Sequence, residues 1–371
     1  MSSADMREDP LVREAIRLLN EEYEANKDFN ESFEADEPVR IGRLEFPKSR
    51  ALFWLDRDAY YEAQEEWKND SLQDQHELCF TLLRANGLET PFSELAAAVE
   101  RGRVVPFVGA GMSRPMGMPL WGDALRELLG RMPGANIAAI NAQIDTGQYL
   151  AAAQALVEHD AVKAENFVST KYRVQRIKLA GPMMLLPRVA KGCVITTNFD
   201  DAIEQAYGHD DVRFDAYMHG KQEHNFFRRL VRGDRCLLKL HGDADNPATH
   251  ILTQAQYAEG YGKPFDFQKP LPKALRQVFV SQSLLFLGCS LEQDWTLELF
   301  EKAKQADEYA IPNHYAILPA PADAQAKQKK ETRLLKLNIQ PLWYPDNEHA
   351  FVERYLQLII DVAERRISYN G

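Results

Sequence analysis

Three short blocks of small and polar residues could carry out chemistry together. They are residues 109–113 (Gly-Ala-Gly-Met-Ser), 196–200 (Thr-Thr-Asn-Phe-Asp) and 241–243 (His-Gly-Asp), and each follows an apolar run. In open α/β sheets, ligands bind in the crevice outside the carboxyl ends of the strands. If the three runs are parallel strands, then glycines, an amide, a carboxylate and an imidazole line one pocket.

The first block could hold a phosphate group. Gly109 and Gly111 let the backbone turn tightly and can present N–H groups to a pyrophosphate. A tight strand-to-helix turn without any ligand explains the same two glycines equally well. Residues 112–121, which follow, are rich in Gly, Pro and Met and could fold over a bound nucleotide.

The other blocks offer polar groups for a sugar. Asn198 could hold ribose hydroxyls or a water, and Asp200 could bind a carboxamide, although an Asx turn with a helix cap is the commoner role of either residue. His241, with an ordinary pKa near ~6.5, could act as a general base toward a sugar hydroxyl. Gly288 and Ser290 follow a fourth apolar run and could contact a phosphate or ribose. The Gly-x-Ser-x-Gly pattern of a nucleophile elbow is missing, so we do not expect a hydrolase triad.

Short apolar runs alternate with helical segments from about residue 103 onward. This alternation indicates an α/β fold with a mostly parallel sheet that is covered on both faces. Pro106 interrupts the first run, where we accept it as a local irregularity because proline cannot donate to a sheet ladder. The predicted strands are residues 104–108, 193–196, 237–240, 251–253, 284–287, 315–318 and 339–343.

The pattern divides the chain into three parts. We predict a mostly helical extension over residues 1–90, the α/β domain over 91–349 and a C-terminal helix over 350–371. Alanine-rich residues 136–192 predict a helical subdomain inserted between the first two strands.

Within the extension, Asp9-Pro10 is typical of a helix start, and residues 40–46 alternate like one edge strand. Residues 51–67 predict one helix, and a second helix is expected to end at Gly87. The aromatic residues near position 55 favour a core or a subunit interface over a base-stacking platform; they are Phe53, Trp54, Tyr60 and Tyr61.

Charge and cysteine usage exclude several classes of protein. With 44 Lys and Arg against 55 Asp and Glu, the 371-residue chain has a net charge of −11, which argues against direct nucleic-acid binding. The four cysteines are far apart and form no CxxC pair, so we expect no zinc ribbon and no disulfide framework. His209, His219, His224 and His250 lack the spacing of metal ligands with a nearby acidic partner, so we expect no metal. No targeting segment and no apolar run of ~20 residues is found, so we expect a cytoplasmic protein without a membrane anchor.

Taken in order, the motifs resemble those of the sirtuin superfamily. The resemblance rests on residues 109–113, 117–119, 196–200, 241–242 and 288–291, and it covers roughly Phe92 to Tyr344. It implies a Rossmann-like NAD-binding domain with a small inserted helical domain.

The same resemblance implies a role for each site residue. Asn198 and Asp200 would face the nicotinamide ribose, and His241 would be the catalytic base. The residues that would bind the rest of the NAD molecule are Gly109, Ala110, Gly111 and Ser113 on the pyrophosphate side and Gly288 and Ser290 on the adenosine side.

Departures from the protein-deacylating sirtuins point to one branch. Their four-cysteine zinc ribbon is absent here, whereas Phe199, Asp243, the loop at residues 117–121 and the helical insertion resemble bacterial sirtuin-like NADases of anti-phage defence. The implied reaction cleaves NAD, as substrate, to nicotinamide and ADP-ribose. No sensor domain is recognised, and the chain resembles the sirtuin-like partner of HerA-type hexameric ATPases, which implies control by homo-oligomerisation or by such a partner.

Two alternatives are kept. One is an NAD-dependent protein deacylase, against which the missing zinc cysteines count. The other is a non-catalytic subunit that binds NAD or ADP-ribose, against which the intact Asn198 and His241 count modestly.

Overall fold

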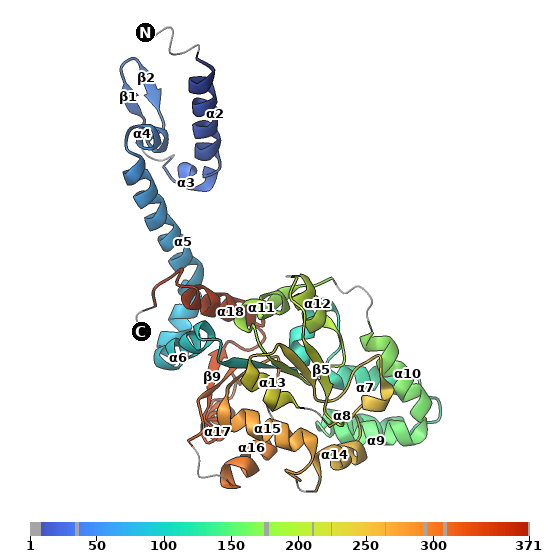
Figure 1. The fold of residues 1–371 in the computed structure, drawn as a ribbon. Helices are drawn as coiled ribbons and strands as arrows, with labels where there is room; N and C mark the ends of the chain where they lie inside the picture. The colour runs from blue at the N-terminus through green and yellow to red at the C-terminus, as the bar shows by residue number, and fades with distance from the viewer. Residues whose placement is uncertain are drawn as a thin grey trace. The chain divides into compact units, whose positions relative to one another are not determined.

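A computed structural model describes residues 9–33, 37–173, 178–209, 211–223, 225–263, 265–291, 295–306 and 310–369. The chain forms two compact units, of which the first ends at Glu77 and the second begins at Leu78 (Figure 1). The elements of the first unit are α2 (Pro10–Glu24), α3 (Lys27–Glu31), β1 (Val39–Ile41), β2 (Leu44–Phe46), α4 (Lys48–Leu55) and the start of α5 (Arg57–Ala85).

The first unit confirms one helix start and corrects two predicted elements. Asp9 caps α2 by accepting a hydrogen bond from the Leu11 N–H. The single strand predicted over residues 40–46 is wrong, because β1 and β2 form an antiparallel hairpin that turns at Gly42, where φ is +66°. The predicted boundary between the two helices is also wrong. The first helix, α4, ends before Asp56, whose carboxylate accepts a hydrogen bond from the Ala59 N–H, and α5 then runs without interruption to Ala85.

An aromatic cluster forms the core of the first unit. Tyr23, Phe29, Phe53 and Tyr60 are buried together, and Tyr60 lies edge-on to both Phe29 and Phe53. The core interpretation is thus confirmed for Phe53 and Tyr60, whereas Trp54 is exposed.

The second unit is an α/β fold of the Rossmann-like kind that the sequence predicts. In the part of the chain that the structure describes, seven parallel strands lie in the order β5-β6-β4-β3-β7-β8-β9. The strands are β3 (Val104–Val108), β4 (Val194–Thr196), β5 (Ala216–His219), β6 (Cys236–Lys239), β7 (Ser283–Leu287), β8 (His314–Pro319) and β9 (Ile339–Tyr344).

Burial explains most of the sheet. Every residue of β3, β4 and β6 is buried, as expected for parallel strands covered on both faces. Pro106 is tolerated because β3 begins to pair with β4 only at Phe107, one residue later.

Two strand predictions fail. Residues 251–253 form no strand; instead Thr253 caps α14 (Gln254–Tyr261) through a capping box with Gln256. The apolar runs also do not predict β5, an edge strand whose residues are mostly part-exposed and therefore lack a continuous apolar run.

Helices cover both faces of the sheet (Figure 1). On one face lie α6, α11, α12 and α18, and on the other lie α13, α15 and α16. The helices are α6 (Glu89–Glu100), α7 (Trp121–Gly130), α8 (Ile137–Asp145), α9 (Tyr149–His159), α10 (Ala161–Tyr172), α11 (Leu186–Val189), α12 (Ala202–His209), α13 (Phe226–Arg232), α14 (Gln254–Tyr261), α15 (Pro270–Ser281), α16 (Trp295–Ala306), α17 (Ala324–Leu335) and α18 (Ala350–Ala363).

Short 3-10 helices complete the chain path. They are η1 (Ala110–Met116), η2 (Gly181–Leu185) and η3 (Pro247–Thr249). The predicted loop after Gly111 therefore contains η1 before α7 begins at Trp121. Helices α8, α9 and α10 occupy the chain between β3 and β4, where the helical insertion is expected.

Candidate functional site

A cavity of about 610 Å³ opens at the carboxyl edge of the sheet. It lies where the chain order reverses, because β4 flanks β3 on one side and β7 flanks it on the other. Such switch points are the usual ligand sites of open α/β sheets. All the site residues named from the sequence line this cavity; they are Gly109, Ala110, Gly111, Ser113, Asn198, Asp200, His241, Gly288 and Ser290.

The glycines after β3 let two loops interlock. Gly111 N–H donates to Gly288 O at 3.0 Å, and Gly109 N–H donates to Leu287 O at 2.8 Å. A Cβ added at Gly109 would lie 2.6 Å from Gly288 O, and one added at Gly288, where φ is +66°, would lie 2.4 Å from Met112 N. Loop packing therefore requires these glycines, and the two N–H groups are used within the protein. Contact of this block with a pyrophosphate stays a prediction.

Asn198 is held in place by the ends of β3 and β4. Its backbone N–H donates to the Thr196 hydroxyl, which itself donates to Val108 O. Its side-chain amide donates to Gly109 O at 3.2 Å and to the Ser113 hydroxyl at 3.0 Å. The Asn198 Oδ1 atom is buried and has no hydrogen-bond partner among the described residues. An acceptor without a donor in a cavity wall is suited to a ligand hydroxyl or a water.

Asp200 is turned into the protein. One carboxylate oxygen accepts from the Ser113 hydroxyl at 3.2 Å and from the Ala202 N–H at 3.2 Å, next to the start of α12. Burial raises the pKa of Asp200. The Asx-turn interpretation of this residue is thus realised, and through Ser113 the same carboxylate also supports Asn198.

His241 follows β6 at a sharp turn. Gly242 has φ +98°, and a Cβ added there would lie 2.4 Å from Thr249 O. The imidazole Nε2 of His241 lies 2.8 Å from the Tyr257 hydroxyl. Burial lowers the pKa of His241 to about 4, against an opposing backbone hydrogen bond with Thr197. The imidazole is therefore neutral at pH 7 and able to accept a proton.

Aromatic side chains that the motifs do not reveal complete the wall of the cavity. Tyr257 stacks on Tyr261 of the same helix with ring centroids 5.3 Å apart, and both rings lie against Trp295. Trp121 and Tyr149 reach the cavity from α7 and α9. The aromatic spacing of four residues in α14 is the one sequence signal that pointed to this wall.

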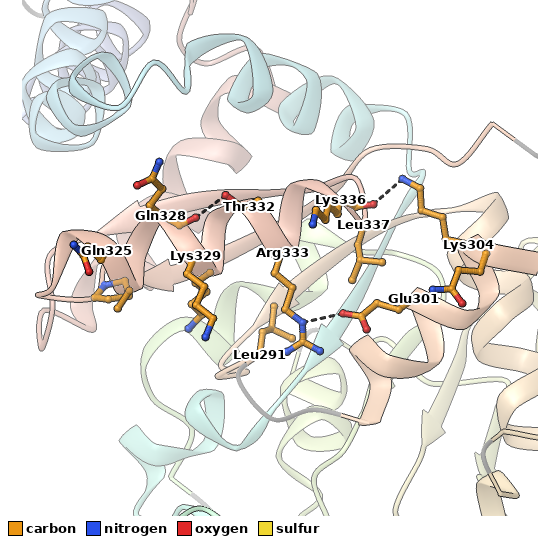
Figure 2. A pocket seen from close by; sticks show the side chains of 14 residues that line it. Leu291, Glu301, Lys304, Gln325, Gln328, Lys329, Thr332, Arg333, Lys336 and Leu337 are labelled. Carbon is orange, nitrogen blue, oxygen red and sulfur yellow. Dashed lines mark hydrogen bonds and ion pairs between the residues drawn. The ribbon is translucent and has the colours of Figure 1, made fainter.

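A larger hollow of about 1120 Å³ lies between α16 and α17 (Figure 2). No proposed site residue lines it, although Leu291, the last residue of the motif at 288–291, does. Most of the charged side chains that line it are cations. Arg333 pairs with Glu301 at 2.8 Å, however, and Lys304 donates to Lys336 O at 2.7 Å. The chemistry-bearing blocks do not reach this hollow.

Two features are absent from the described residues. No cluster of three or more His, Cys, Asp and Glu side chains is arranged to hold a metal ion. In the same residues, no helix combines the length and the apolar character that crossing a bilayer requires.

Part of the second unit is similar to a known domain. Residues 192–342 match the SIR2-like domain. The SIR2-like segment runs from β4 to β9 and so contains Asn198, His241 and Gly288, whereas the block at residues 109–113 precedes it.

Curated relatives are similar over a longer stretch. The NAD(+) hydrolase ThsA of Bacillus cereus (strain MSX-D12) is 24% identical over 212 residues, which cover 57% of this chain and 42% of the relative. The NAD(+) hydrolase ThsA of Acinetobacter baumannii (strain 532279) is 28% identical over 223 residues, which cover 59% of this chain and 43% of the relative. The chain thus spans less than half the length of the curated relatives it matches.

Proposed function

We propose that this protein is an NAD glycohydrolase that cleaves NAD to nicotinamide and ADP-ribose. The observation that carries the proposal is the meeting of Asn198 and His241 in one cavity at the switch point of a Rossmann-like sheet. The SIR2-like segment and the two NAD(+) hydrolase relatives support NAD as the substrate.

The reaction needs few protein groups. The bond between the ribose C1′ and the nicotinamide nitrogen breaks, and its electron pair neutralises the pyridinium ring. A water oxygen then bonds to C1′ and gives up a proton, which yields ADP-ribose. Because the transition state is oxocarbenium-like, orientation of the ribose and of the water supplies most of the protein's contribution.

We assign to Asn198 the role of binding the attacking water or a ribose hydroxyl. Its unpartnered Oδ1 can accept a hydrogen bond, while the bonds from its Nδ2 to Gly109 O and the Ser113 hydroxyl fix the direction of the amide. An acceptor that is oriented in advance needs no reorganisation during the reaction.

We assign to His241 the role of proton acceptor. Its neutral imidazole can polarise a ribose hydroxyl or accept the proton of the attacking water. The Tyr257 hydroxyl occupies Nε2 in this structure, so a substrate hydroxyl must replace it.

The remaining site residues are assigned to the rest of the substrate. Asp200 would support the nicotinamide ribose side by fixing Ser113, which itself belongs to the pyrophosphate side. Gly109, Ala110 and Gly111 would border the pyrophosphate, and Gly288 and Ser290 the adenosine.

An enzyme that removes NAD from a cell needs control. From the resemblance to sirtuin-like defence NADases, we propose a cytoplasmic role in anti-phage defence, within a homo-oligomer or an assembly with a HerA-type hexameric ATPase. A net charge of −11 supports protein partners over direct nucleic-acid contact.

The test follows the release of nicotinamide and ADP-ribose from NAD by the full chain, alone and with a candidate ATPase. Light scattering on the same samples reports the oligomer. We expect cleavage by the wild type and loss in Asn198→Ala and His241→Ala. If the wild type matches these variants under every condition but binds NAD, the protein is a binding subunit; transfer of an acyl group from a peptide would instead show a deacylase.

A further inference from the structure

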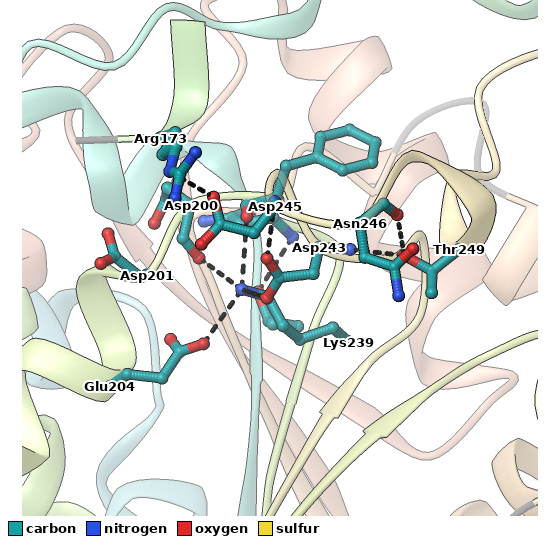
Figure 3. A network of polar contacts seen from close by, with 12 residues as sticks. Arg173, Asp200, Asp201, Glu204, Lys239, Asp243, Asp245, Asn246 and Thr249 are labelled. Atoms are coloured by element: carbon teal, nitrogen blue, oxygen red, sulfur yellow. Dashed lines mark hydrogen bonds and ion pairs between the residues drawn. The ribbon is translucent and has the colours of Figure 1, made fainter. Parts of the chain in front are cut away.

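Lys239 is a buried cation behind the proposed site. It is the last residue of β6, it is 1% exposed, and it does not line the cavity. Figure 3 shows its ammonium group among four acceptors. The distances from Nζ are 2.8 Å to Asp200 O, 3.2 Å to Phe199 O, 2.8 Å to Asp243 Oδ2 and 3.0 Å to Glu204 Oε1.

Three of these acceptors belong to the two loops that carry the proposed chemistry, and the fourth, Glu204, lies in α12. The carbonyls of Phe199 and Asp200 directly follow Asn198, and Asp243 comes two residues after His241. One ammonium group therefore joins the loop after β4 to the loop after β6. Backbone hydrogen bonds assist it, among them Ala244 N–H to Phe199 O at 3.0 Å.

The far side of Asp243 is also fixed. Its second carboxylate oxygen accepts from the Asp245 N–H at 2.9 Å, and its own N–H donates to the Thr249 hydroxyl at 3.0 Å. The tie from Lys239 thus ends on a residue that cannot swing freely.

The charge state suits this role. Burial opposes the ammonium form, but Glu204 and Asp243 outweigh burial and raise the pKa of Lys239. A leucine or methionine at this position would leave the carboxylates of Glu204 and Asp243 without their cation and Asp200 O without this donor, so general packing does not explain a lysine here.

We propose that Lys239 is a positioning residue that holds Asn198 and His241 at their working separation for cleavage of the glycosidic bond. The inference rests on the proposed function. Lys239 touches no substrate, and it acts through the backbone of the loop after β4 and through Asp243.

The experiment separates positioning from stability. Lys239→Met alone leaves the carboxylates of Glu204 and Asp243 without their paired cation. It is therefore compared with the triple variant Lys239→Met/Glu204→Gln/Asp243→Asn, in which neither of these charges remains. Lys304→Met is the matched control, because Lys304 also donates to a backbone carbonyl and a side chain, Lys336 O and Asn338 Oδ1, but beside the second hollow (Figure 2).

We expect the triple variant to regain most of the thermal stability that Lys239→Met loses, while its kcat for nicotinamide release falls about 100-fold with little change in KM. Lys304→Met should keep the wild-type kcat. A triple variant that is stable and has wild-type kcat would overturn the inference. If the triple variant does not fold, Asp243→Ala, which removes the acceptor of one arm of the tie, should lower kcat about 10-fold, and an unchanged kcat there would overturn it equally.

Hydrogen exchange provides a readout that does not depend on activity. In the two variants that lack Lys239, the backbone amides of residues 198–202 and 241–246 should exchange at least about 10-fold faster than in the wild type, while the amides of the sheet stay protected. If the wild type releases no nicotinamide, the proposed function fails while this measurement still decides whether Lys239 ties the loops together. Unchanged exchange in both segments would show that it does not.

Discussion

The hydroxyl of Tyr257 lies 2.8 Å from Nε2 of His241. Tyr257 is held there by its stack on Tyr261 and by the edge contact with Trp295. The nitrogen that the proposed reaction uses is therefore already hydrogen-bonded before a substrate arrives. A ribose hydroxyl has to compete with a tyrosine from the same cavity wall.

Tyr257→Phe tests this competition. The ring and its stacking stay while the competing hydroxyl is lost, so Nε2 is left without that partner. We expect KM for NAD to fall by about 3-fold to 10-fold, as exchange of one hydrogen bond allows, with kcat little changed. A kcat reduced about 100-fold at unchanged KM would instead identify the hydroxyl as a proton relay.

The pH dependence of activity tests the state of His241. Burial lowers the pKa of His241 to about 4, so its neutral form persists well below pH 6. The profile of kcat/KM reports groups of the free enzyme, and its acid limb should therefore lie near pH 4 to 5. Circular dichroism at each pH controls for unfolding. An acid limb near pH 6.5 would mean that His241 is solvated as an ordinary histidine.

The loop glycines predict a contrast between two alanine substitutions. Gly288→Ala places a Cβ 2.4 Å from Met112 N at a residue with φ +66°, and it should cost about 2–4 kcal/mol of unfolding free energy. Gly130→Ala, at the end of α7, meets nothing within 4 Å and should be neutral or stabilising by up to about 1 kcal/mol. Urea unfolding measures both, and equal stabilities would contradict the proposed interlock of the loops.

The free energy of unfolding should decrease as the pH is lowered, in part because of His314. Burial lowers its pKa to about 3, and its Nδ1 accepts from the Leu284 N–H at 3.2 Å. The unfolded chain takes up the proton below about pH 6.5 but the folded chain does not, so the stabilisation present above pH 6.5 is lost progressively as the pH falls toward 3. From pH 7 to pH 5 this amounts to about 2 kcal/mol.

His314→Asn separates this contribution from the others. The asparagine oxygen can still accept from Leu284, and the variant should lose about 2 kcal/mol less than the wild type between the two pH values. Denaturant titrations at pH 7 and pH 5 give the comparison. Parallel losses in both proteins would assign the pH effect to other groups.

The sequence was most informative where burial is continuous. Apolar runs predicted β3, β4, β6, β7, β8 and β9 because a parallel strand covered on both faces needs apolar side chains throughout. It failed at β5, a part-exposed edge strand, and at residues 251–253, where the same kind of run leads into a helix cap. Short apolar runs carry no information about whether a neighbouring strand is available.

The sequence alone was enough to predict which small and polar residues line the cavity, but not its aromatic wall. Small and polar residues directly after buried strands must lie at the carboxyl edge of a parallel sheet, so the blocks around Gly109, Asn198 and His241 had to meet. The contacts of each atom, in contrast, follow from how the strands and loops pack in three dimensions. Three contacts join segments that are distant in sequence or lie on different elements. They are the hydrogen bond from Lys239 to Asp200 O, the contact of Tyr257 with His241 and the hydrogen bond from Gly111 to Gly288. Such pairings depend on strand order and loop packing, which no local pattern encodes.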